Sequence, residues 1–385
     1  MRIGIIIGIM LYRKECFYVY NLIRMSYFSA NPYKPYNPYF MKRLSLLSIF
    51  ILFISIHCWS FNSNDSAQVY LQKGLQAKTE RRWQVAINHL QKAMTFDSTD
   101  IKVLTALGEV AMEMRQYNAA INAFEKLDRV SPDNEKAIEN LAQLYSWFRN
   151  SEKVNYYAGR MEKLKIGGGK PHYLIGMAAY RDENYAVAIN RLLNYLDYDP
   201  RNAEVLYSIG RSYVDLEHYD KAVTYYEKAI AADSSSFMRI YELGMVYYSL
   251  SNNKKAIEYY ELAATKGMRQ DGEYFVNLGN VYMNVGDTKK GIELFKKALE
   301  KKPFTPSIMN DLAYAYYYNK NYQEAIDTWD QVMQVNKNDA KALFMIGMAY
   351  QKKGDKAKGQ ALCDKAIELD PSLAGQKQQK GGFGM

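Results

Sequence analysis

The chain has 385 residues, a formal net charge of +9 at pH 7 and 48% hydrophobic residues. Residues 1–60 hold seven Lys or Arg and one Asp or Glu, so they supply +6 of that charge, whereas residues 61–385 hold 43 basic and 40 acidic residues. A near-neutral remainder with interspersed charges excludes the broad basic surface that phosphate backbones attract, so we expect no nucleic-acid partner.

The first 60 residues fall into two segments. Residues 41–60, MKRLSLLSIFILFISIHCWS, combine a basic start, an apolar run over residues 44–56 and small residues at Cys58 and Ser60. This order predicts a secretory signal peptide cleaved after Ser60, since the apolar run is short for a membrane-spanning helix. Residues 1–40 are rich in Tyr and Pro without a burial pattern, and we interpret them as a non-native extension upstream of a start at Met41.

From residue 67 onward the sequence repeats with a period of 34 residues, with one step of 35. Small residues recur at one register: Gly74, Gly108, Ala142, Gly176, Gly210, Gly244, Gly279, Ala313 and Gly347. Twelve residues further on lies a second small register: Ala86, Ala120, Val154, Ala188, Ala222, Ala256, Gly291, Ala325 and Gly359. A third register holds mostly large residues: Leu90, Phe124, Ala158, Leu192, Tyr226, Tyr260, Phe295, Trp329 and Cys363.

This spacing resembles the tetratricopeptide repeat (TPR), a 34-residue helix–turn–helix unit. Nine units start near Ala67, Ile101, Glu135, Gly169, Ala203, Phe237, Gly272, Pro306 and Ala340. The resemblance implies an all-α fold, a right-handed α-solenoid of TPR repeats, with repeats one to three in residues 67–168 and repeats four to nine in residues 169–373. Two short amphipathic helices cannot bury their apolar faces alone, so the units must stack. The Gly- and Gln-rich residues 374–385 are expected to be a disordered tail.

Two packing expectations follow from the registers. Tyr213 shares a register with Tyr145, Tyr247 and other tyrosines that should be buried between helices, and Tyr226 occupies the large-residue register. The third repeat should be the most poorly packed, because Val154 and Ala158 reverse the small-then-large order and three glycines follow at residues 167–169. We therefore predict a hinge there.

No catalytic, metal or cofactor site emerges from the sequence. His89, His172 and His218 lie in different repeats and registers, and KIGGGKPHY at residues 165–173 does not satisfy the phosphate-loop pattern. Beyond the signal segment Cys363 is the single cysteine, so no disulfide within the chain is available. We expect no enzyme, no metal and no cofactor.

In TPR proteins the second, fifth, ninth and twelfth residues of each first helix face a concave groove, and this resemblance implies where a partner binds. In repeats four to nine those offsets carry Tyr, Met and Asn, which suit adaptable protein contact. The predicted groove residues are Tyr173, Met177, Tyr180, Tyr207, Arg211, Tyr241, Met245, Tyr248, Asn280, Asn310, Tyr314, Tyr317 and Phe344. The fifth positions carry no lysine, so the carboxylate clamp of many family members is absent.

The leading hypothesis is an exported, non-enzymatic scaffold that binds a protein or extended peptide, in the periplasm or cell envelope if the source is bacterial. The alternative is a membrane-anchored envelope assembly factor that retains residues 44–56 as an uncleaved N-terminal helix. Membrane association is expected only through that segment. A third class, a sugar-transferring enzyme that carries such repeats, would need a catalytic domain in addition.

Overall fold

The structure is a computed structural model that describes residues 66–375, and within these residues it contains helices and no strand. The predicted signal peptide at 41–60, the upstream residues 1–40 and positions 376–385 of the predicted tail lie outside the described residues. The described chain forms two compact parts, which meet in the sequence between Arg115 and Gln116. No helix among residues 66–375 is both long and apolar enough to cross a bilayer.

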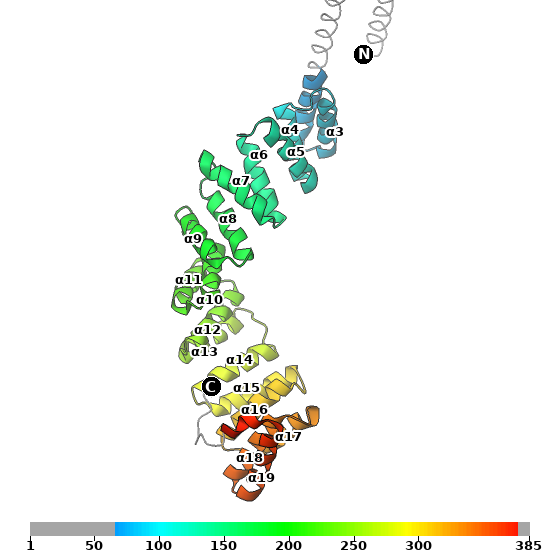
Figure 1. Cartoon of the computed structure of the whole chain (residues 1–385). Helices are drawn as coiled ribbons and strands as arrows, with labels where there is room; N and C mark the ends of the chain where they lie inside the picture. The colour runs from blue at the N-terminus through cyan, green and yellow to red at the C-terminus, as the bar shows by residue number, and fades with distance from the viewer. Residues whose placement is uncertain (1–65, 376–385) are drawn as a thin grey trace, which may run out of the picture. The chain divides into compact units, whose positions relative to one another are not determined.

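The N-terminal part contains three described helices (Figure 1). They are a helix over residues 66–79, α3 (Trp83–Met94) and α4 (Ile101–Glu113). The side chains of Lys78 and Glu109 form an ion pair between the first and third of these helices. Leu90 is fully buried against Gly74, where an added Cβ would lie only 2.7 Å from the Leu90 Cγ atom.

The C-terminal part is a tandem series of helix pairs that follow one another along the chain (Figure 1). The helices are α5 (Tyr117–Val130), α6 (Glu135–Trp147), α7 (Ser151–Leu164), α8 (Lys170–Arg181), α9 (Tyr185–Leu196), α10 (Ala203–Asp215), α11 (Tyr219–Ala232), α12 (Phe237–Ser249), α13 (Asn253–Thr265), α14 (Gly272–Asn284), α15 (Thr288–Lys301), α16 (Pro306–Tyr318), α17 (Tyr322–Val335), α18 (Ala340–Lys353) and α19 (Lys356–Leu369), followed by the short 3-10 helix η1 (Pro371–Leu373). The first helices start at or within one residue of the predicted repeat starts.

Side-chain caps and left-handed turns set the helix boundaries. Asn134 precedes α6, Asn202 precedes α10 and Asp339 precedes α18, and each side chain accepts a hydrogen bond from a backbone N–H of the first turn. The turn inside each pair contains one residue with positive φ, and glycine takes this place at Gly286 and Gly354. The other residues at this turn position are Arg81, Arg115, Arg149, Glu183, Glu217, Ser251 and Lys320. The turns therefore repeat with the same period as the helices.

The small-residue register brings the two helices of a pair close together, as the sequence predicts. An added Cβ at Gly210 would lie 2.9 Å from the Tyr226 ring, and one at Gly244 would lie 2.8 Å from the Tyr260 ring. Tyr226 and Tyr260 are almost completely buried at these crossings. The prediction that small residues accommodate a large residue of the partner helix is confirmed.

The poor packing predicted for the third repeat stays a prediction, although the residues on which it rests are buried. Val154, Ala158 and Met161 on α7 are all fully buried. Tyr157 supplies the missing bulk, since its ring is 4% exposed and stacks on Tyr145 at a centroid distance of 5.8 Å. An aromatic residue one position before the small residue thus fills the volume. The hinge itself stays a prediction.

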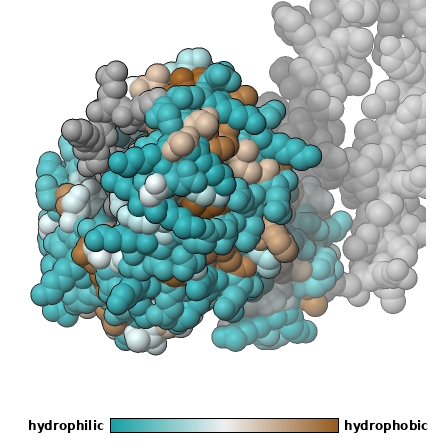
Figure 2. Space-filling view, turned by 90° about the horizontal axis from the view of Figure 1, so that it is seen from below, coloured by the Kyte–Doolittle hydropathy of each residue, from teal (hydrophilic) through white to brown (hydrophobic). Residues whose placement is uncertain are grey.

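The surface view from below in Figure 2 is largely hydrophilic, and hydrophobic residues appear there as small separate areas. Isolated apolar residues on a surface are ordinary in soluble proteins. The apolar side chains of the helices are mostly used between helices, where the core of the C-terminal part lies.

Candidate functional site

The predicted groove residues all lie on the first helices of the pairs, from α8 to α18. Most of them are half-buried: Tyr173, Met177, Tyr180, Tyr207, Arg211, Asn280, Asn310, Tyr314 and Tyr317. Met245 and Tyr248 on α12 are more open, with 43% and 36% of their surface exposed. These side chains keep part of their surface free while packing on their own helix pair.

Two predicted groove residues are interior instead, which corrects the assignment. Tyr241 is 5% exposed because its ring packs on Tyr260 at a centroid distance of 5.0 Å and on Tyr274 at 6.3 Å. Phe344 is 1% exposed and belongs to the same buried cluster as Cys363. Cys363 is small where five of the other repeats place an aromatic residue, and Phe344 is buried in the same cluster.

Glu242 is the centre of the most extensive polar contact on these helices. Its carboxylate is 16% exposed and receives three hydrogen bonds from two other helices. Tyr207 donates its hydroxyl to Oε1 at 3.1 Å, Arg211 donates Nη1 to the same oxygen at 3.0 Å, and Tyr226 donates its hydroxyl to Oε2 at 2.7 Å. α10, α11 and α12 are therefore joined through one carboxylate.

This contact fixes the Tyr207 ring and suppresses ionisation of its hydroxyl. The rings of Tyr207 and Tyr226 meet edge to face, with centroids 5.6 Å apart and an interplanar angle of 89°. Burial, reinforced by the negative charge of Glu242, raises the pKa of Tyr207 to about 12. Burial and Glu242 also raise the pKa of Tyr226. Both phenols are neutral hydrogen-bond donors at physiological pH.

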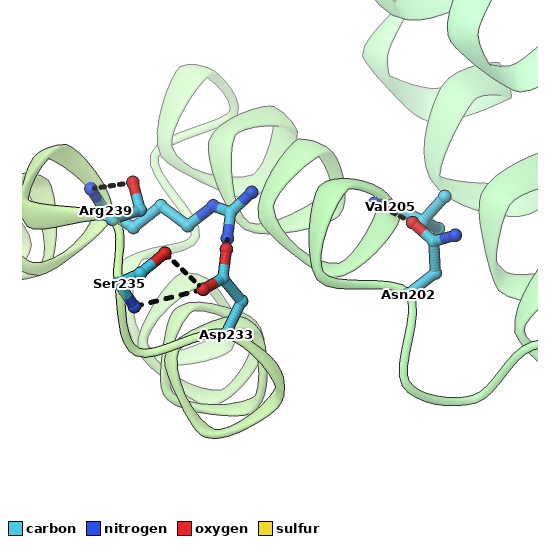
Figure 3. Close-up of polar contacts among 6 residues, drawn as sticks. Asn202, Val205, Asp233, Ser235 and Arg239 are labelled. Atoms are coloured by element: carbon cyan, nitrogen blue, oxygen red, sulfur yellow. Dashed lines mark hydrogen bonds and ion pairs between the residues drawn. The ribbon is translucent and has the colours of Figure 1, made fainter.

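A second cation, the guanidinium of Arg239 at the start of α12, lies close to Tyr207. Figure 3 shows Arg239 reaching across the connection between α11 and α12 to the Asp233 side chain, with an Nη1–Oδ2 distance of 2.8 Å. The other oxygen of Asp233 accepts hydrogen bonds from the backbone N–H and the hydroxyl of Ser235. The Arg239 guanidinium also lies 5.6 Å from the centroid of the Tyr207 ring. Tyr207 is thus held on two sides.

Polar side chains at the sixth position of a first helix form contacts that the sequence analysis missed. Glu242 holds this position in α12, where it meets Tyr207 of the preceding repeat. Asn277 holds it in α14 and donates Nδ2 to the Tyr241 hydroxyl at 2.6 Å. A signal was available, because both polar residues interrupt the apolar face of their helices at the same register. Only the second, fifth, ninth and twelfth positions of each first helix were considered in the sequence analysis, so the sixth was not included.

The Tyr213 register is also less buried than predicted. Tyr213 is half-buried and stacks on Tyr225, with centroids 5.6 Å apart. Lys221 Nζ lies 5.4 Å from the centroid of the Tyr213 ring. Tyr247, at 4% exposure, is the register member that matches the prediction of full burial. This register lies at the edge of the boundary between repeats, where hydroxyls can reach charged side chains. Tyr226 in the large-residue register is buried as predicted.

A surface pocket of about 590 Å³ lies where the connection between α9 and α10 meets the end of α11. It is lined by Leu196, Pro200, Arg201, Leu206, Lys228, Ala231 and Ala232. None of these is a predicted groove residue, so the pocket and the first-helix residues are separate features. Within residues 66–375 no group of three or more potential metal ligands occurs.

Comparison with known families identifies the chain as a tetratricopeptide-repeat protein. One tetratricopeptide-repeat model matches residues 173–237, 207–273 and 276–340, and a second matches residues 101–134 and 340–373. Together they cover more than half of the sequence. The chain therefore belongs to this family, and the expected all-helical fold of tandem TPR helix pairs is confirmed.

Two curated proteins illustrate how distant its relatives are. The chain is 24% identical over 184 residues to Tetratricopeptide repeat protein 21B of Xenopus laevis, which covers 46% of this chain and 14% of that protein. It is 20% identical over 298 residues to the BBSome complex member BBS4 homolog of Drosophila melanogaster, which covers 74% of this chain and 61% of that protein. The chain thus spans less than two thirds of the length of either relative.

Among solved structures, the C-terminal part of a TPR repeat-containing protein from Cytophaga hutchinsonii is similar in fold. The match has a TM-score of 0.51 and 19% sequence identity, and it covers 62% of this chain and 98% of that one. At this identity the similarity supports the fold of stacked helix pairs and carries no function with it.

Proposed function

We propose that this protein is an exported, non-enzymatic scaffold that binds an extended peptide or a protein surface along the first helices of residues 169–373. The observation that carries the proposal is the half-buried set of Tyr, Met and Asn side chains on α8 to α16. Rings such as Tyr207 are held in place by contacts within the protein and still present part of their surface. Rigid aromatic side chains of this kind lose little entropy on binding.

Two further points support an interaction role over catalysis. The phenols whose pKa is raised by burial, such as Tyr173 and Tyr207, are poorer proton donors and acceptors near neutral pH than ordinary tyrosines. The Drosophila relative is by name a member of a complex, the BBSome, which is an assembly role compatible with a scaffold. For this chain we therefore propose protein contact as the activity.

Export remains part of the proposal through the signal-peptide pattern of residues 41–60. In a bacterium the compartment would be the periplasm or cell envelope. The alternative, a membrane-anchored assembly factor, differs in retaining the apolar run at residues 44–56.

Site-specific photo-crosslinking in native cells tests the binding surface. A benzophenone amino acid is placed at Met245 or Tyr248, which are exposed predicted groove positions, and at Tyr198, which is 61% exposed on the connection after α9. We expect Met245 and Tyr248 to yield one defined crosslinked partner that the Tyr198 position does not. Equal adducts at all three positions, or adducts at Tyr198 alone, would contradict the proposed surface.

A further inference from the structure

Two carboxylates occupy the same place in two repeats and differ in their surroundings. Glu242 is the sixth residue of α12, and Asp311 is the sixth residue of α16. Glu242 is neutralised by Arg211 and receives hydroxyl hydrogen bonds from Tyr207 and Tyr226. At Glu242 an acid in this position therefore binds a guanidinium beside two aromatic rings.

Asp311 has none of these partners. In the preceding repeat, the residues that share a register with Tyr207, Arg211 and Tyr226 are Val276, Asn280 and Phe295. Val276 packs against a buried cluster that contains Leu312, the residue that follows Asp311 in the chain. Among the described residues no hydrogen bond or ion pair reaches the Asp311 side chain. Burial without a compensating charge raises the pKa of Asp311 to about 6.

Aromatic residues other than those at Glu242 lie near Asp311, and the nearest along α16 is Tyr314, about one helical turn further on. Tyr314 and Tyr317 follow it on the same helix, and their rings lie 5.3 Å and 6.2 Å from the Trp329 ring. Both tyrosines are half-buried, so parts of their rings remain accessible. Burial is the main cause that raises the pKa of the Tyr314 hydroxyl. The negative charges of Asp339 and Asp311 raise it further. A carboxylate and a tyrosine ring are present, and no basic side chain among the described residues pairs with Asp311.

We propose that Asp311, with Tyr314, receives an arginine or lysine side chain of the bound partner segment. The inference rests on the proposed function, because it assigns a chemistry to part of the same surface. An unpaired, partly buried carboxylate is unfavourable until a cation supplies the missing charge. A guanidinium suits the place best, because it can bind the carboxylate and stack on a neighbouring ring. The partner is therefore an extended segment with a basic residue, arginine preferred.

Selection from a random peptide library displayed on phage tests this proposal without a candidate partner in hand. The full chain is used as bait, and selected 12-residue peptides are synthesised and titrated against it. We expect a basic residue at one recurring place in the selected peptides. Asp311→Asn should weaken their binding by about tenfold or more, since a hydrogen-bonded charge pair is lost. Asp311→Glu should retain part of the affinity.

Matched variants separate charge recognition from general damage. Asp327→Asn removes an exposed carboxylate from α17 in the same repeat and should leave binding unchanged. A peptide whose basic residue is replaced by Glu should bind Asp311→Lys better than it binds the unaltered chain. The reversed preference would show direct contact between the two charges, which a folding defect cannot produce.

The possible outcomes distinguish a failure of this inference from a failure of the proposed scaffold function on which it rests. Peptides that bind Asp311→Asn within about twofold of the unaltered chain would overturn the inference and leave the scaffold function intact. A selection that yields no binding peptide would contradict the proposed function and the inference with it. A dimer of the unaltered chain that Asp311→Asn dissociates would place a second copy of this chain on Asp311, and this would also overturn the proposal.

Discussion

Tyr247 donates its hydroxyl to Glu227 across the boundary between two repeats, with an oxygen–oxygen distance of 2.6 Å. Tyr145 makes the same contact with Glu125 at 2.7 Å, and Tyr282 with Glu261 at 3.0 Å. In each case the glutamate follows the residue of the large register in the preceding repeat. The contact recurs where that position carries a glutamate, so it is a repeat-to-repeat connection encoded by one side chain.

Removing the Tyr247 hydroxyl should show how much this hydrogen bond contributes to the stability of the protein. We expect Tyr247→Phe to lower the free energy of unfolding by about 1 kcal/mol, because the substitution removes the donor of a hydrogen bond whose acceptor, Glu227, is charged but partly exposed. Tyr213→Phe is the matched control, since no hydrogen bond of the Tyr213 hydroxyl is present among the described residues and the change should be near zero. Urea unfolding of both variants measures the difference. Equal losses would show that the hydroxyl of Tyr247 contributes nothing specific.

Tyr207→Ala should destabilise the protein more than its position on the binding surface alone would imply. The substitution removes the edge-to-face contact with Tyr226 and one of the three hydrogen bonds to Glu242. We expect a loss of about 2 kcal/mol, and about 1 kcal/mol for Tyr207→Phe. Tyr213→Ala should cost a similar amount, about 2 kcal/mol, because Tyr213 is half-buried and leaves a smaller cavity than a buried ring. Thermal melts of the three variants provide the comparison.

The pKa of Asp311 predicts a pH-dependent stability term. Burial raises this pKa from 3.8 to about 6, so the folded chain binds the proton more tightly than the unfolded chain. The resulting stabilisation is present below pH 4 and is lost as the pH rises through about 6. At pH 7.5 Asp311→Asn should therefore raise the free energy of unfolding by about 1 kcal/mol, after allowance for partial exposure, and at pH 4.5 by much less. A gain independent of pH would argue against an uncompensated carboxylate.

Two glycine substitutions should change the stability of the protein in opposite directions. At Gly347 an added Cβ would lie 2.7 Å from Cys363 Sγ and 2.8 Å from the Gly359 carbonyl oxygen, so Gly347→Ala should cost about 2 kcal/mol. At Gly159, within α7, the added Cβ would meet nothing within 4 Å. Gly159→Ala should stabilise by about 0.5–1 kcal/mol through helix propensity. Denaturant midpoints of the two variants test both signs, and stabilisation by Gly347→Ala would refute the close helix crossing.

The start of the mature protein is a separate prediction. The signal-peptide pattern places the mature N-terminus at Phe61, because the basic, apolar and small residues end at Ser60. N-terminal sequencing of protein purified from native cells checks this directly. Recovery of residues 44–56 on the protein in a membrane fraction would favour the anchored assembly factor, and recovery of residues 1–40 would refute the start at Met41.

The sequence by itself determined the repeat, the helix starts and the glycine crossings of this protein. These features depend on local spacing: a small residue at Gly210 and a large one at Tyr226 recur every 34 residues, and each amphipathic helix must stack to bury its apolar face. The register therefore places each residue on a helix and on one side of it.

The tertiary structure alone decided which partner each side chain meets. Glu242 is paired with Arg211 of α10 and accepts a hydrogen bond from Tyr226 of α11, whereas Asp311 at the same register meets no counter-charge among the described residues. Phe344 is interior beside the small Cys363, and Tyr213 is half-buried although its register predicted a core residue. The physical reason is that these contacts join different helices, in some cases helices of different repeats. A side chain's burial and charge environment depend on residues about 16 to 36 positions away, whose size and chemistry vary while their spacing does not.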